Sequence, residues 1–131
     1  MKSIVRLVLL SLMMSAVSLA ADLYPNQPKL SAAHRNLMAA RRQMDKVDVS
    51  GSAPSKKALT EATVSLNTAR KYLEDAAKNK GSHRTAAIGH IDKAKAQIQK
   101  LSQGGGSASS VVAEIDIAVT DVKEAARAGR R

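Results

Sequence analysis

Three histidines, His34, His83 and His90, carry the most distinctive side-chain chemistry of this chain. Imidazole nitrogens are favoured ligands of copper, zinc and nickel, so these residues are candidate metal ligands. His83 and His90 are seven residues apart, which on a helix places them two turns and about 10 Å apart on one face. Two ligands at that separation do not chelate one ion together. A metal site would therefore need His34 or a carboxylate from another helix.

Motifs for catalysis are missing from the sequence. There is no cysteine to act as a nucleophile, and neither a His-Glu-x-x-His pair nor a Gly-x-Ser-x-Gly elbow occurs. Residues 104–106 are three glycines, but they follow an expected helix rather than a strand, so they lack the geometry that cradles a phosphate. Glu74 and Asp75 are adjacent, and on a helix they point about 100° apart. We therefore expect no catalytic residues, no cofactor and no enzymatic activity.

The elements that must position these side chains follow from a seven-residue pattern that recurs in four segments. The pattern alternates large aliphatic side chains with alanine at spacings of three and four residues, which makes a narrow apolar seam along a helix. The seam positions are Leu30, Ala33, Leu37, Ala40, Met44, Val47; Leu59, Ala62, Leu66, Ala69, Leu73, Ala76; Ala87, Ile91, Ala94, Ile98, Leu101; and Ala108, Val111, Ile115, Ala118, Val122, Ala125. Because a seam is buried only against other seams and the connections are short, the sequence predicts an all-α fold. The expected architecture is an antiparallel up-down-up-down four-helix bundle with Ala-rich heptad seams.

Turn-forming residues between the seams set the expected boundaries. Pro28 suits the first turn of the first helix, and Gly81 suits the turn before the third. A single four-helix domain is expected over residues 21–131. The helices are expected at about residues 28–48, 55–79, 82–102 and 107–128.

Residues 1–20 resemble a cleavable signal peptide. Two basic residues precede and interrupt an apolar run, and the small residues Ser18 and Ala20 lie three and one positions before a cut preceding Ala21. The run is shorter than the roughly 20 apolar residues of a membrane span, so no transmembrane segment is expected after cleavage. The alternative is that the segment stays as an N-terminal anchor. The expected location is the bacterial periplasm or the secreted fraction.

Short motifs recur among the segments. The stretches Leu37–Met44, Leu66–Leu73 and Ile91–Ile98 share the spacing of a large aliphatic residue, an alanine, a base and a second large residue. In addition, Ile91-Asp92-x-Ala94 recurs as Ile115-Asp116-x-Ala118. Duplication of a helical hairpin and convergence on an Ala-rich seam both account for this repetition.

The charge of the chain bears on its partners. The formal net charge is +10 at pH 7, and the excess of bases lies outside residues 107–128, which are net acidic. Such a protein attracts anionic envelope polymers, lipids or acidic proteins. Nucleic acid is not expected as a partner, because only Tyr24 and Tyr72 could stack on bases and no run of five basic residues occurs. Two copies could also pair through an alanine-rich face as a homodimer.

These observations predict an exported, non-catalytic binding or interaction protein of the bacterial cell envelope. Its partner is unknown; an anionic polymer and a protein are the two candidates. The alternative function is that of a small periplasmic metal-binding helical bundle for copper, zinc or nickel, with His34, His83 and His90 as the candidate ligands.

Two stretches carry a resemblance to known proteins. Residues 37–47 and the segment Gly-Ser-His-Arg-Thr-Ala-Ala-Ile-Gly-His-Ile-Asp-Lys-Ala at 81–94 resemble an uncharacterised family of small secreted bacterial Ala/Arg-rich helical-bundle proteins. The resemblance covers roughly residues 30–100 and implies a helical bundle and secretion, but no activity. The same Gly-x-His turn is more weakly similar to small periplasmic histidine-rich metal-binding bundles, and that similarity implies metal affinity.

Overall fold

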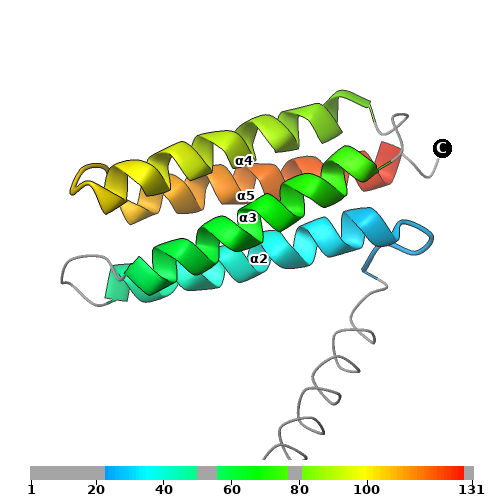
Figure 1. The fold of residues 1–131 in the computed structure, drawn as a ribbon. Helices are drawn as coiled ribbons and strands as arrows, with labels where there is room; N and C mark the ends of the chain where they lie inside the picture. The colour runs from blue at the N-terminus through cyan, green and yellow to red at the C-terminus, as the bar shows by residue number, and fades with distance from the viewer. Residues whose placement is uncertain (1–22, 50–55, 77–80, 129–131) are drawn as a thin grey trace, which may run out of the picture.

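The computed structural model describes residues 23–49, 56–76 and 81–128. Within these ranges the chain forms four helices and no strand: α2 (Pro28–Val49), α3 (Lys56–Asp75), α4 (Gly81–Ser102) and α5 (Ala108–Ala128). Consecutive helices run antiparallel, each packs against the next, and α2 also packs against α5, so the four close into a bundle (Figure 1). The predicted fold class is confirmed. None of the described helices combines the length and the hydropathy that a membrane crossing requires.

The helix boundaries agree with the sequence prediction except at the end of α3. The second helix was expected to reach residue 79, but α3 ends at Asp75, and Ala76 forms a bend. Side chains of neighbouring helices donate hydrogen bonds to the last carbonyl groups of α3. Arg84 of α4 donates to the Leu73 oxygen at 2.9 Å, and Lys29 of α2 donates to the Asp75 oxygen. The Ala76 N–H donates to the same Leu73 oxygen at 3.3 Å. The expected signal peptide, residues 1–20, and the segment 50–55 between the first two helices lie outside the described residues.

The core consists of the predicted seams. All the predicted seam positions are buried except Ala108, which is the first residue of α5 and only partly buried. Large residues such as Leu37, Leu66 and Ile91 are fully covered, and the alanines between them let the helix backbones approach closely. Regular close packing therefore replaces bulky aromatic side chains in this core.

The bundle consists of two hairpins, and an ion pair of described residues lies at each of the two interfaces between them. The interfaces within the hairpins, α2–α3 and α4–α5, are more extensive than those between the hairpins, α2–α5 and α3–α4. Arg41 of α2 pairs with Asp116 of α5 at 2.8 Å, and Arg70 of α3 pairs with Asp92 of α4 at 2.9 Å. These four residues belong to the motifs that recur in the sequence. Arg41 of α2 corresponds to Arg70 of α3, and Asp116 of α5 corresponds to Asp92 of α4. The repeated motifs therefore occupy equivalent positions in the two interfaces between the hairpins.

Candidate functional site

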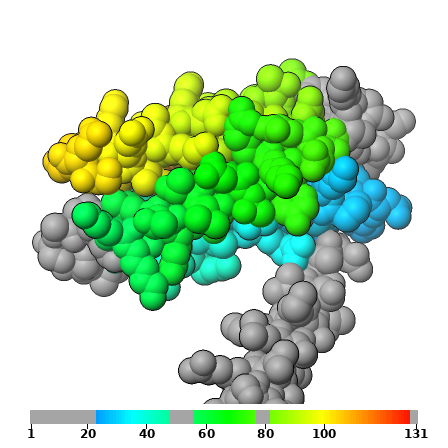
Figure 2. All heavy atoms as spheres, in the orientation of Figure 1, coloured from blue at the N-terminus to red at the C-terminus, as the bar shows by residue number. Residues whose placement is uncertain are grey.

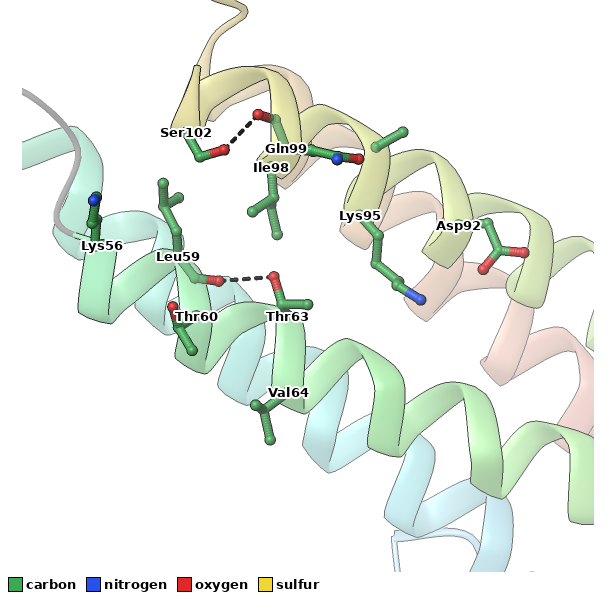
Figure 3. Close-up of a pocket in the computed structure, with 11 residues that line it drawn as sticks. Lys56, Leu59, Thr60, Thr63, Val64, Asp92, Lys95, Ile98, Gln99 and Ser102 are labelled. Atoms are coloured by element: carbon green, nitrogen blue, oxygen red, sulfur yellow. Dashed lines mark hydrogen bonds between the residues drawn. The ribbon is translucent and has the colours of Figure 1, made fainter. Parts of the chain in front are cut away.

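A groove lies on the surface between α3 and α4. It occupies the part of their interface where α3 begins and α4 ends, and its volume is about 670 Å³ (Figure 3). The ribbons of α3 and α4 move apart toward this end (Figure 1). In the space-filling view, the atoms of α3 and of the C-terminal half of α4 lie on the same face of the molecule (Figure 2). The interface of α3 and α4 is also the smallest of the four. The groove is therefore the place where the bundle is least tightly closed.

The floor and walls of the groove differ in chemistry. Leu59 of α3 and Ile98 of α4 form the floor, and each is only 4% exposed. Thr63 and Val64 of α3 and Lys95 of α4 lie on the walls, and Val64 is 59% exposed. Short threonine side chains and a flexible lysine leave space between the helices that paired leucines would fill. The result is an apolar groove with polar groups along its sides.

Two polar side chains along the groove, Thr63 and Asp92, are held by hydrogen bonds. The Thr63 hydroxyl donates to the Leu59 carbonyl at 2.9 Å, so it adds little polarity to the floor. At the closed end, the Asp92 carboxylate accepts two hydrogen bonds from Arg70, at 2.9 and 3.4 Å, and Arg70 also pairs with Glu74. Lys95 makes neither an ion pair nor a hydrogen bond with any other described residue. The groove therefore carries a net positive potential from Lys95 and, at its open end, Lys56.

Two of the candidate metal ligands lie together at the α4–α5 interface. His83 Nδ1 lies 3.3 Å from Asp121 Oδ1, and His90 Nε2 lies 4.0 Å from Asp121 Oδ2. His90 Nδ1 contacts Glu114 Oε2 at 2.7 Å. The tertiary structure thus places the Asp121 carboxylate of α5 near both histidines. A carboxylate from another helix is one of the two groups that a metal site at His83 and His90 was expected to need. These contacts link α4 to α5.

His34 has different surroundings, on α2. Its Nδ1 forms a 2.9 Å hydrogen bond with the Tyr24 hydroxyl, and the two rings pack edge to face with centroids 5.7 Å apart. Burial lowers the pKa of His34 below 6.5, and the positive charge of Lys123 lowers it further. The neutral imidazole is therefore the favoured form. The contacts of His34 differ from those of the other two histidines.

A metal centre is not assembled in the described part of the chain. No group of three or more histidine and carboxylate side chains in residues 23–49, 56–76 and 81–128 is placed to hold a metal ion. Metal binding by His34, His83 and His90 stays a prediction from the sequence.

Sequence reasoning assigned no function to the groove. It read Leu59 and Ile98 correctly as seam residues, but it did not indicate that the seams of α3 and α4 separate beside them. One signal was available in the sequence. Thr60, Thr63 and Val64 are three β-branched residues within five positions of α3, and such residues are less favoured in helices than unbranched ones.

Comparisons with known proteins give no relative. No family model matches this sequence, and neither the curated proteins nor the solved structures contain a significant match. The resemblance to small secreted Ala/Arg-rich bundles therefore stays a prediction.

Proposed function

We propose that the protein is an exported, non-catalytic binding protein of the bacterial envelope whose ligand occupies the groove between α3 and α4. The observation that carries this proposal is the groove itself. Its volume of about 670 Å³ falls in the range of small-molecule sites, roughly 300–1,000 Å³. Its apolar floor is typical of such sites, and the polar side chains along its walls could orient a ligand.

The side chains at the groove support binding rather than catalysis. The titratable residues among its described lining are Lys56, Lys95 and Asp92, and the carboxylate is held by Arg70. A general base or an activated nucleophile requires a partner group within hydrogen-bond reach, and this lining offers no such pair. The groove has the means to hold a ligand and to orient it by charge.

The export part of the proposal rests on the sequence of residues 1–20. Its test is to express the full sequence in a bacterial host, separate the cell fractions and sequence the N-terminus of the recovered protein. We expect the protein in the periplasmic or secreted fraction, beginning at Ala21. Recovery of an intact N-terminus in the cytoplasm would contradict export and leave the binding part to be judged separately.

The binding part is tested with the apolar anionic dye anilinonaphthalene sulfonate and a pair of matched variants. Thr63→Phe places a ring in the groove, whereas Thr68→Phe makes the same change five residues further along α3, outside the groove. The two threonines are well matched, because each donates its hydroxyl to the carbonyl four residues earlier at 2.9 Å. We expect saturable dye binding to the wild type and to Thr68→Phe, and a loss of at least fivefold in affinity for Thr63→Phe. Equal dye binding by the two variants, or none by the wild type, would contradict a ligand site in the groove.

A further inference from the structure

The chemistry of the groove indicates what kind of ligand would fit it. An apolar floor formed by Leu59 and Ile98 runs beside Lys95, which is half-buried and has no partner among the described residues. Figure 3 shows the Lys95 side chain extending from α4 into the space between the two helices. A ligand that combines an apolar body with one anionic group would cover the floor and also neutralise this ammonium.

The dimensions favour a single chain over a helix of a partner protein. The groove spans Lys56 to Val64 on α3, which is about 12 Å along the helix axis. Over about 12 Å a partner helix would contact the groove with only about eight residues, and an isolated helix of that length is marginal in water. An extended alkyl chain is much thinner, and it can lie along the axis of the groove between the two helices.

We propose that the groove binds a free fatty acid, with the alkyl chain along Leu59, Ile98 and Val64 and the carboxylate at the Lys95 ammonium. This proposal rests on the proposed binding function and specifies its ligand class. The alkyl chain itself leaves water when it lies in the groove, and the carboxylate forms a charge-assisted hydrogen bond with the lysine. The Asp92 carboxylate is hydrogen-bonded to Arg70, and the two lysines of the lining outnumber this one carboxylate.

The shape of the groove favours a free fatty acid over a membrane surface. Binding to a bilayer needs apolar side chains that project into it, as on an amphipathic helix lying in the interface. Here the apolar residues Leu59 and Ile98 lie at the floor and are each 4% exposed, whereas Val64 is the exposed apolar residue on the wall. Of these three apolar residues, Val64 alone projects far enough to enter a bilayer.

The test uses the protein purified after expression of its full sequence, with sodium dodecanoate, dodecanol and hexanoate as probes. Binding is measured by dye displacement and by the shift of the thermal midpoint, at neutral pH and below the critical micelle concentration. The variants are Lys95→Gln and its matched control Lys93→Gln, an exposed lysine of the same helix outside the groove. Both variants lose the same charge, so a difference between them reports position rather than net charge.

We expect dodecanoate to bind more tightly than dodecanol, because dodecanol lacks the negative charge. Hexanoate should bind weakly, because its alkyl chain is only half as long. Lys95→Gln should weaken dodecanoate about five- to tenfold and leave dodecanol unchanged, whereas Lys93→Gln should change neither. High salt should reduce the preference for dodecanoate over dodecanol.

Other outcomes separate the failure of this proposal from that of the binding function. Equal binding of dodecanoate and dodecanol, unaffected by Lys95→Gln but lost in Thr63→Phe, would overturn the carboxylate assignment and leave a neutral apolar ligand in the groove. Binding to phosphatidylglycerol vesicles without binding to dodecanoate would overturn the free fatty acid in favour of a membrane surface. Failure of every probe, with Thr63→Phe and Thr68→Phe alike in dye binding, would refute both the fatty acid and the groove as a ligand site.

Discussion

Two leucines of α3 provide a direct test of how tightly the bundle is closed. Leu66 is fully buried within the core, whereas Leu59, two helical turns earlier, is 4% exposed and forms the groove floor. Leu→Ala removes three carbons, and the lost transfer free energy is about 2–2.5 kcal/mol at roughly 0.8 kcal/mol per methylene. At Leu66 a closed cavity adds to this cost, because the neighbouring alanines Ala62 and Ala69 are too short to fill it. We therefore expect Leu66→Ala to lower the free energy of unfolding by about 3–4 kcal/mol.

At Leu59 the same truncation deepens a groove that is already open to solvent. No closed cavity forms there, so we expect a loss of about 2 kcal/mol, mostly the transfer contribution. The assay is urea unfolding followed by far-UV circular dichroism, with the slope against denaturant required to be the same for wild type and variants. The thermal midpoint should fall by at least about 12 °C for Leu66→Ala and by clearly less for Leu59→Ala.

The comparison of the two variants decides the result. If Leu59→Ala destabilises the protein as much as Leu66→Ala, then α3 and α4 enclose Leu59 in solution and the reasoning about the groove is refuted. A Leu66→Ala cost below about 1.5 kcal/mol would show instead that the core relaxes around the truncation. Because the two residues share their type and their helix, differences in helix propensity cancel between them.

Three further predictions concern other parts of the molecule. Burial and Lys123 lower the pKa of His34 in the folded state, so the unfolded chain binds the proton more readily and the free energy of unfolding should fall as the pH drops below about 6.5. Urea unfolding across this pH range should show a smaller fall for His34→Asn, and an identical pH profile would contradict the assignment. Gly89 has no atom within 4 Å of the position that a Cβ would take, so Gly89→Ala should stabilise the exposed helix position by about 0.5–1 kcal/mol in thermal unfolding; a lower midpoint would show that the alanine strains α4. Arg70 and Asp92 form a pair whose side chains are 36% and 48% exposed, so a double-mutant cycle should give a coupling of about 0.2–1 kcal/mol that decreases at high salt. No coupling at low salt would remove this pair from the account of how α3 is held against α4.

The sequence alone was sufficient to predict the fold class and almost the whole core. The heptad spacing identified most of the buried core residues. It could do so because helical periodicity is a local property, and a narrow apolar seam has few ways to be covered. Ala108 differs because it is the first residue of α5, where the bundle no longer covers it fully. The repeated Arg and Asp motifs were also visible in the sequence, but not their pairing across the hairpins.

The tertiary structure decided the features that depend on contacts between distant segments. The end of α3 at Asp75 depends on side chains of α2 and α4 that take its last carbonyls. The pairing of His83 with Asp121 depends on how α5 is aligned against α4. The groove arises because two seams that look alike in sequence pack closely at the Arg70–Asp92 end and separate beyond it. Periodicity specifies which face of each helix is buried, whereas the distance between two buried faces depends on all the side chains that meet there.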